Sequence, residues 1–292
     1  MGIKVSIITV CYNAADTIED TILSIENQSY ENIEYIVIDG GSTDGTLDII
    51  DKHKESVSYF VSEPDNGIYD AMNKGIINAT GEWLSFMNAG DVYTSDNTIE
   101  SLVKEIPPPY HEVDAKASQQ IRIVRGNIIR DYANFTIKSS GVTIQNPGLM
   151  DMFNNTFHHQ ACLIQRSLFK DYGLYAIEYK LTADWKFFFD CVILHHVRTK
   201  YIDIDVARFM MDGVSSKNVQ ECEKEQKLYL RCLLGDELYN ILNELNVYRK
   251  SSFCRWYCKT YLKLRNGLSP KNFNRVLTLK RLLRSKLGLK VN

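Results

Sequence analysis

Four aspartates stand where apolar segments of the chain end, and their side chains could hold a cation. They are Asp39, Asp44, Asp65 and Asp91. Clustered carboxylates repel one another unless a cation joins them, and hard oxygen ligands favour Mg²⁺ or Mn²⁺, ions that typically carry phosphates. Each acid also has a structural alternative, because Asp44 and Asp91 could cap helices and Asp39 could stabilise a turn. Their recurrence at successive strand ends favours a shared site.

The segments around these acids alternate between the patterns of buried strands and amphipathic helices. Continuous apolar runs predict strands at 5–10, 33–41, 56–67 and 81–91. Apolar residues at helical spacing predict helices at 16–28, 43–54, 68–80 and 96–106. This alternation predicts an α/β fold with a mostly parallel, Rossmann-like sheet flanked by helices. Ligands of such sheets bind beyond the carboxyl ends of the strands, which is where the four acids stand.

Motifs of other nucleotide and hydrolase sites are absent from the sequence. It contains no GxxxxGK[ST] segment, and its DGGSTDGT segment lacks the GxGxxG spacing, so a P-loop and a dinucleotide site are disfavoured. The HExxH and GxSxG patterns are absent as well. The acidic edge of the sheet is therefore the main candidate for a functional site.

Four segments, in order along 5–96, resemble the family 2 glycosyltransferases, which have the GT-A fold. They are VSIITVCYN, IEYIVIDGGSTDGT, EPDNGIYDAMNKGI and GEWLSFMNAGD. The third is similar to the form in bacterial enzymes of polysaccharide synthesis, and HHQACLIQRSLF and TADWKFF look like the acceptor half. The resemblance implies a GT-A catalytic domain at 1–216, with a nucleotide-sugar half at 1–100 and an acceptor half at 101–216. A helical C-terminal extension is expected at 217–292.

The resemblance also implies which residues contact the donor. Those expected to line the base and ribose are Thr9, Cys11, Tyr12 and Asn13. Asp39 would accept a hydrogen bond from the base, often from N3 of uracil, while Asp44 and Asp65 would lie near the ribose and the sugar. Arg208, just before the predicted loop at 212–216, is a candidate partner of the donor phosphates.

Asp91 matches the last acid of the DxD-type motif and would therefore ligate a metal that bridges the donor diphosphate. Family members often have DxDD here, whereas this chain has Asn88 and Gly90 ahead of Asp91. Asn88 can still offer a carbonyl oxygen, so we expect modest affinity for Mg²⁺ or Mn²⁺, with phosphate oxygens and water completing the shell. His158 or His159 could approach as well. Because neighbouring residues on a strand point to opposite faces, at most one of them is expected to reach the site, and packing on the acceptor side is the alternative.

Asp184 is the candidate base that deprotonates the acceptor hydroxyl, as an acid at this place does in inverting members of the family. Apolar neighbours, Phe187 and Phe188 among them, predict a raised pKa for this carboxyl. The structural alternative is a helix N-cap, a role that Thr182 could fill instead. Trp185 could stack on an acceptor sugar or pack in the core.

The C-terminal segment is electrostatically distinct from the rest of the chain. Residues 249–292 contain 13 Lys and Arg and no Asp or Glu, which leaves −15 for the remainder of a chain whose net charge is −2. Basic amphipathic helices favour anionic membrane surfaces. Nucleic acid would attract the same charge, but no nucleic-acid motif supports that partner. The seven irregularly spaced cysteines and the lack of a signal peptide or spanning segment predict a cytoplasmic protein, peripheral on the inner face of the membrane.

Together these features predict a metal-dependent, inverting glycosyltransferase of hexosyltransferase type. Its donor would be a nucleotide-sugar, of UDP type, and its acceptor a glycan or a polyprenyl-linked glycan in cell-surface polysaccharide synthesis. Two alternatives stay open. A nucleotidyltransferase would usually have a Gly-rich basic loop after the first strand, and Cys11 to Asp16 contain no Gly, Lys or Arg. A catalytically impaired module that binds carbohydrate or nucleotide-sugar remains compatible with the weakened NAGD motif.

Overall fold

The structure is a computed structural model that describes residues 2–107, 120–132, 134–153, 155–210 and 218–250. The chain forms two compact units, Met1–Tyr229 and Leu230–Asn292. The first unit includes part of the helix Val219–Leu234, which begins after the predicted domain boundary at residue 216. The domain boundary at residue 216 stays a prediction.

The first half of the larger unit alternates strands and helices, as the sequence predicts. Its elements are β1 (Val5–Cys11), α1 (Ile18–Glu26), β2 (Ile33–Asp39), α2 (Thr46–Lys52), β3 (Tyr59–Ser62), α3 (Ile68–Asn78), β4 (Trp83–Phe86), β5 (Val92–Tyr93) and α4 (Thr98–Val103). The strand pairs β1–β2, β2–β3 and β1–β4 are parallel. The carboxyl ends of these four strands therefore meet at one edge of the sheet.

The second half adds strands that run mainly against their neighbours. Its elements are β6 (Ile121–Tyr132), β7 (Phe135–Ser139), α5 (Leu149–Met152), the 3₁₀-helix η2 (His159–Ala161), β8 (Cys162–Gln165), α6 (Ser167–Tyr172), α7 (Ala183–Phe189), the π-helix η3 (Asp190–Leu194) and β9 (Arg198–Met210). The helix α9 (Val219–Leu234) follows, and α10 (Asp236–Lys250) belongs to the second unit. The described strands form one sheet in the order β3-β2-β1-β4-β8-β6-β9-β5, and β7 pairs with β6 as a hairpin.

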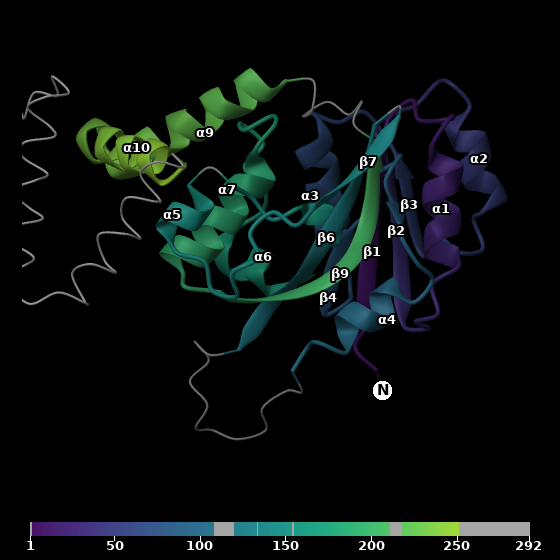
Figure 1. Ribbon diagram of the computed structural model, residues 1–292. Helices are drawn as coiled ribbons and strands as arrows, with labels where there is room; N and C mark the ends of the chain where they lie inside the picture. The colour runs from purple at the N-terminus through teal and green to yellow at the C-terminus, as the bar shows by residue number, and fades with distance from the viewer. Residues whose placement is uncertain (1, 108–119, 133, 154, 211–217, 251–292) are drawn as a thin grey trace, which may run out of the picture. The chain divides into compact units, whose positions relative to one another are not determined.

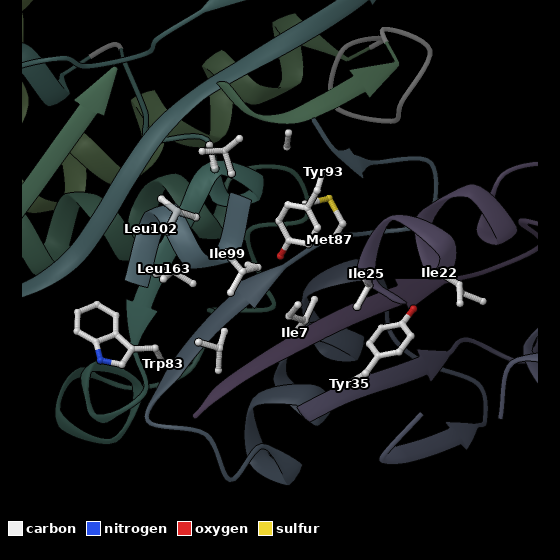
Figure 2. Packing of buried hydrophobic residues seen from close by; sticks show 14 of the residues in the cluster. Ile7, Ile22, Ile25, Tyr35, Trp83, Met87, Tyr93, Ile99, Leu102 and Leu163 are labelled. Carbon is white, nitrogen blue, oxygen red and sulfur yellow. The ribbon is translucent and has the colours of Figure 1, made fainter. Parts of the chain in front are cut away.

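One face of the sheet is covered by α1 and α4, and the side chains between them form a continuous core. Figure 1 shows α1 and α2 on one side of the first strands and α3 on the other. The spacing of Ile18, Ile22 and Ile25 places all three on the buried face of α1. They belong to the same cluster as Ile7, Tyr35, Trp83, Met87, Tyr93, Ile99 and Leu102 (Figure 2). Burying each such aliphatic side chain contributes about 1.5–3 kcal/mol, which fixes the strand ends in place.

The opposite face receives α3, which packs closely on β1. A Cβ at Gly75 would lie 2.4 Å from Cγ2 of Ile8, so only glycine permits this approach without a shift. Met72 and Ile76 of the same helix are buried. The close packing brings Tyr69, in the first turn of α3, to the carboxyl edge of the sheet.

The described part of the second unit is short. Arg231 pairs with Asp236 at 3.2 Å and lies over the ring of Tyr239 at 5.2 Å. Among the described helices, none is both long and apolar enough to cross a membrane. Most of the basic segment at 249–292 lies outside the described residues, so the predicted membrane contact of that segment stays a prediction.

Candidate active site at the carboxyl edge of the sheet

Asp91 stands at the end of a tight turn that joins β4 to β5. Its backbone N–H donates to the carbonyl of Asn88 at 2.9 Å, and Gly90 adopts a φ of +95°, which favours glycine. Thr21 on α1 holds the turn, because its hydroxyl donates to the Asp91 carbonyl at 2.9 Å and accepts from the Gly90 N–H at 3.0 Å. The N-cap of the following helix α4 is Asn97, so the alternative that Asp91 caps this helix is wrong.

The carboxyl of Asp91 is almost fully enclosed, since the residue is only 5 % exposed. Burial raises its pKa to about 7, although the charge of His159 and a hydrogen bond from Gln160 act in the opposite direction. Burial disfavours the charged form of an acid. A positive charge brought close to Asp91 would therefore be strongly stabilising.

Asn88 supplies a second oxygen in the same turn. Its Nδ2 lies 3.3 Å from Nε2 of His159, and its Oδ1 is buried without a hydrogen-bond partner among the described residues. An unpaired buried acceptor costs about 1–3 kcal/mol. A bound cation, or rotation of the Asn88 amide, would remove this cost. Carboxylate and amide oxygens, which Asp91 and Asn88 contain, are ligand types that Mg²⁺ and Mn²⁺ accept together with phosphates and water. No cluster of three or more His, Cys, Asp or Glu side chains in the described part of the chain could hold a metal alone.

His159 connects this turn to Asp184 at the start of α7. Nδ1 of His159 lies 2.9 Å from Oδ2 of Asp184, and the Tyr69 hydroxyl donates to Oδ1 of the same carboxylate at 2.7 Å. The side chains of His159 and Asp184 are 13 % and 15 % exposed. The arrangement joins residues from the β4 turn, η2, α7 and α3 into one buried polar network.

The hydrogen bonds in this network set the protonation of Asp184. Burial alone would raise the pKa of the carboxyl, but the hydrogen bond and charge of His159, together with the Tyr69 hydroxyl, lower it below its ordinary value. The predicted rise is therefore wrong, because polar partners outweigh the apolar neighbours. Burial would likewise lower the pKa of His159, but Asp184 raises it above its ordinary value. Thr182, not Asp184, is the N-cap of α7, so the structural alternative for Asp184 is also wrong.

The neighbours of His159 and Asp184 in the sequence point elsewhere. Nε2 of His158 lies 3.0 Å from the Ser139 hydroxyl, and burial, with the charge of Arg130, lowers its pKa to about 3. Trp185 is 1 % exposed, and its Nε1 donates to the Met152 carbonyl at 3.2 Å. Stacking of Trp185 on an acceptor sugar is therefore wrong, and its alternative as a core residue holds.

Thr9 and Cys11 are buried, because β1 is a central strand in which every residue on both faces is buried. The Thr9 hydroxyl donates to the Met87 carbonyl at 2.8 Å and accepts from the Tyr35 hydroxyl at 3.1 Å. The Cys11 thiol donates to Oδ1 of Asp39 at 3.5 Å, and burial raises its pKa. The expectation that Thr9 lines a nucleotide is wrong, since it has no exposed surface.

Asp39 lies at the end of β2 with both oxygens already accepting hydrogen bonds. Oδ2 accepts from the backbone N–H groups of Gly41 and Ser42 at 3.0 and 2.9 Å and from the Ser62 hydroxyl at 2.6 Å. Oδ1 accepts from the Ser42 hydroxyl at 2.5 Å. Burial would raise the pKa of Asp39, but the Ser42 and Ser62 hydroxyls lower it. Asp39 thus stabilises the turn after β2, and a base N–H would have to displace one of these hydroxyls.

The loops beside Asp39 expose side chains that a ligand could reach. Tyr12 is 65 % exposed, and Oδ1 of Asn13 accepts from the Thr43 N–H at 2.9 Å. A Cβ at Gly40 would lie 2.7 Å from Oδ2 of Asp65 and 3.3 Å from the Tyr12 ring, so Gly40 lets these side chains approach each other.

The four aspartates do not share one cation. Oδ1 of Asp44 accepts from the Thr46 N–H at 3.1 Å and its Oδ2 from the Ala15 N–H at 3.1 Å, so this carboxylate stabilises the start of α2. Oδ1 of Asp65 accepts from the Gly67 N–H at 2.8 Å. These acids accept hydrogen bonds from nearby backbone and hydroxyl donors, and no three carboxylates of the described residues lie close enough to hold a metal together. The prediction of a shared metal site is therefore wrong, and of the four acids Asp91 stays a candidate ligand.

Arg208 lies on β9, where its backbone pairs with Val92, the residue after Asp91. Its Nε is 3.4 Å from Oδ2 of Asp131, and the side chain is 54 % exposed. The side chain is therefore partly accessible, and its guanidinium pairs with Asp131 of β6.

Two members of the network are missing from the sequence-based predictions. Tyr69 lies in the GIYDAMNKG segment and Gln160 in the HHQ segment, and neither residue is among the predicted site residues. Tyr69 and Asp184 are 115 residues apart, so no local pattern connects them. No local signal marks Tyr69, because Asp70 is a polar residue in the same first turn of α3.

Comparison with known proteins places the chain among sugar transferases. The family model described as "Glycosyl transferase family 2" matches residues 6–173. A "PGL/p-HBAD biosynthesis glycosyltransferase" of Mycobacterium bovis is 30% identical over 244 residues, which cover 81% of this chain and 88% of the relative.

Two solved structures have a similar fold. TarS 1–349 of S. aureus in complex with UDP has a TM-score of 0.57 and 19% identity, over 78% of this chain and 65% of that chain. The mannosyltransferase PcManGT of Pyrobaculum calidifontis, in complex with GDP-Man and Mn2+, has a TM-score of 0.62 and 17% identity, over 97% of this chain and 81% of that chain.

Proposed function

The chain belongs to glycosyltransferase family 2 and has the GT-A fold, and from this premise we propose that it moves a hexose from a UDP-sugar to a hydroxyl of a glycan or lipid-linked acceptor, with inversion. The observation that carries the proposal is the network in which His159 contacts both the Asp91 turn, through Asn88, and Asp184. The network brings Asp91, the candidate metal ligand at the diphosphate, close to Asp184, the candidate base. A direct displacement on a sugar carbon uses both stabilisation of the leaving group and deprotonation of the acceptor.

The donor nucleotide would bind at the ends of β1, β2 and β3. Tyr12 offers an exposed aromatic face to a base, and Asn13 and Asp65 lie in adjoining loops. A carboxylate has about four acceptor sites, and those of Asp39 are already occupied. Asp39 would therefore accept the base N–H only after a serine hydroxyl turns away. Uracil presents such an N–H, which supports a UDP-type donor, and the TarS structure contains UDP.

The diphosphate would lie at the Asp91 turn. Asp91, with Oδ1 of Asn88, would hold Mg²⁺ or Mn²⁺, an ion that stabilises the negative charge of a diphosphate leaving group when it is bound. The buried carboxyl and the unpaired amide oxygen support this role. Arg208, whose backbone pairs with the residue after Asp91 and whose side chain is 54 % exposed, would contribute a positive charge to the phosphates.

Asp184 would act as the general base. Its lowered pKa keeps the carboxylate ionised near neutral pH, so it can take the proton of the acceptor hydroxyl. The acceptor oxygen then forms a bond to the anomeric carbon while the bond from that carbon to the nucleoside diphosphate breaks. Tyr69 and His159 would hold the carboxylate in position, since each donates to a different oxygen of Asp184.

A binding module without transfer activity is the second candidate. The observation that favours it is the loss of acids at Asn88 and Gly90, which leaves Asp91 as the only carboxylate of the motif. Release of nucleoside diphosphate distinguishes the two, because a module of this kind would bind a nucleotide-sugar without cleaving it.

The proposal includes a location on the inner face of the cell membrane, for an acceptor of cell-surface polysaccharide synthesis. It rests on the basic residues of 249–292, which have no acidic neighbours in the sequence. Flotation with anionic vesicles tests it. A chain truncated after Asn246 should lose binding, and equal binding by both chains would contradict this part of the proposal.

The function itself is tested by a thermal-shift screen of nucleoside diphosphates with and without Mn²⁺, followed by donor cleavage. We expect UDP with Mn²⁺ to raise the melting temperature most and Asp91→Ala to remove the metal-dependent part of that rise. A UDP-sugar should then release UDP faster when Mn²⁺ is present. Absence of any metal-stimulated release from nucleotide-sugars would favour the binding module.

A further inference from the structure

We propose that Glu225 on α9 is a positioning residue for Asp184, an inference that rests on the proposed role of Asp184 as the base. Glu225 lies well beyond residues 6–173, which match the family model. It does not touch Asp184 itself. It contacts the segment that leads into α7, where Asp184 occupies the first turn.

The carboxylate of Glu225 accepts three hydrogen bonds from that segment. Oε1 accepts from the backbone N–H of Lys180 at 2.9 Å. Oε2 accepts from the Leu181 N–H at 3.1 Å and from the Thr182 hydroxyl at 2.8 Å. Thr182 occupies the N-cap of α7 without capping the helix through its side chain, so its hydroxyl is committed to Glu225. A negative charge is also favourable beside the N-terminus of a helix.

The same segment is held on its other side by the donor half. The Tyr69 hydroxyl donates to Oδ1 of Asp184 at 2.7 Å and also contacts the Leu181 carbonyl at 3.1 Å. Nζ of Lys180 donates to the Asn66 carbonyl at 3.0 Å. Because one hydroxyl proton is shared between Leu181 and Asp184, displacement of Leu181 alters the hydrogen bond to the carboxylate. The position of residues 180–182 therefore determines how Asp184 is held.

A second contact fixes the register of α9 against α7. Tyr229, one turn after Glu225, has its hydroxyl hydrogen-bonded to Asp190, which directly follows α7. Its ring packs at 5.8 Å from Trp185 and 5.9 Å from Phe189. The helix α9 thus holds both ends of α7, with Glu225 at the end that bears the base.

Steady-state kinetics of full-length Glu225→Ala, Glu225→Gln and Glu221→Gln test the inference. Glu221 is the matched control, because it is exposed on the same helix and contacts Lys224 at 2.6 Å. A small displacement of a reacting group can cost about 100-fold in rate, so we expect Glu225→Ala to lower kcat by about 10- to 100-fold. The donor KM should stay within about twofold, since the donor residues lie elsewhere. Glu225→Gln keeps an acceptor oxygen and should recover part of the loss, and Glu221→Gln should match the wild type.

A double-mutant cycle separates this inference from the proposed function. With enzyme in excess over donor, Glu225→Ala should add no further loss to Asp184→Asn, because both changes act through one carboxylate. Independent losses, an unchanged kcat in Glu225→Ala, or a rise in KM alone would overturn the role of Glu225 while leaving Asp184 as the base. If Asp184→Asn itself keeps wild-type transfer, the proposed function fails as well. Should the alanine variant fail to fold, Glu225→Gln carries the same cycle, with its melting temperature measured alongside.

Discussion

Nδ1 of His159 lies 2.9 Å from Oδ2 of Asp184, so a histidine that also contacts the Asp91 turn holds the candidate base. Replacement of His159 by alanine removes one of the two side-chain donors to that carboxylate. We expect kcat to fall by about 10- to 100-fold, which is the loss typically caused by removing a residue that orients an active-site side chain. Steady-state transfer assays measure the change.

The adjacent histidine provides the control for this prediction. The side chain of His158 hydrogen-bonds to Ser139 rather than to Asp184 or Asn88, so His158→Ala should keep kcat near the wild-type value. Equal losses in the two variants would mean that the contact with Asp184 is not the cause.

The dependence on metal should follow the number of carboxylates in the Asp91 turn. Asn88→Asp adds an acid beside Asp91, and affinity for a hard cation rises with the charge of its ligands. We expect the Mn²⁺ concentration for half-maximal activity to fall by about tenfold in Asn88→Asp and to rise by at least about tenfold in Asp91→Asn. Activity titrations after removal of metal with a chelator measure both. Identical titration curves for the wild type and both variants would exclude a metal at this turn.

Glu34 should make folding stability sensitive to acid. Burial alone would raise its pKa, but hydrogen bonds from Ser6, Thr80 and Lys4 lower the pKa from 4.5 to about 2. The ionised carboxylate therefore stabilises the fold at pH values above 4.5, the pKa of this group in the unfolded chain. This stabilisation is lost as the pH falls from 4.5 towards 2. We expect Glu34→Gln to reduce the free energy of unfolding by up to about 3 kcal/mol near neutral pH.

Urea unfolding at several pH values measures this effect. The difference between the wild type and Glu34→Gln should shrink steadily below pH 4.5. Glu31, which is exposed, gives the control, and Glu31→Gln should have little effect at any pH. A difference for Glu34→Gln that stays constant with pH would show that its charge contributes nothing.

Gly75→Ala should destabilise the protein, because its Cβ would lie 2.4 Å from Cγ2 of Ile8. Overpacking of this kind costs about 1–3 kcal/mol. Gly148 is the matched control, since a Cβ there would meet only Asp151 at 3.8 Å, and Gly148→Ala should change stability by less than about 0.5 kcal/mol. Denaturant unfolding of both variants decides the matter, and equal stabilities would contradict the close packing of α3 on β1.

The fold was largely predictable because its signals are local. Apolar runs such as that of Val5 to Val10 mark buried strands, and the spacing of Ile18, Ile22 and Ile25 marks one face of a helix. These features depend on near neighbours in the sequence. The strand predicted at 81–91 is shorter in the structure, because β4 ends at Phe86 and Gly90 adopts a φ of +95° in the turn that follows.

The site was less predictable because its chemistry comes from contacts between distant segments. The pKa of Asp184 is lowered by His159 and Tyr69, which are 25 and 115 residues away, whereas its sequence neighbours are apolar. Trp185 is of a residue type that often stacks on sugars, yet tertiary packing, which the sequence does not reveal, buries it. The acids after β2 and β3 find backbone and hydroxyl donors in their own loops, which a list of carboxylates does not reveal.

The central claim is that Asp184 takes the acceptor proton in a sugar transfer for which the Asp91 turn binds the donor diphosphate. The most direct measurement is the rate of transfer by Asp184→Asn at saturating donor and Mn²⁺, with donor affinity measured on the same protein. General bases contribute about 10²- to 10⁴-fold, so we predict a loss of that size with donor affinity unchanged. Transfer by Asp184→Asn at a rate close to that of the wild type would contradict the account.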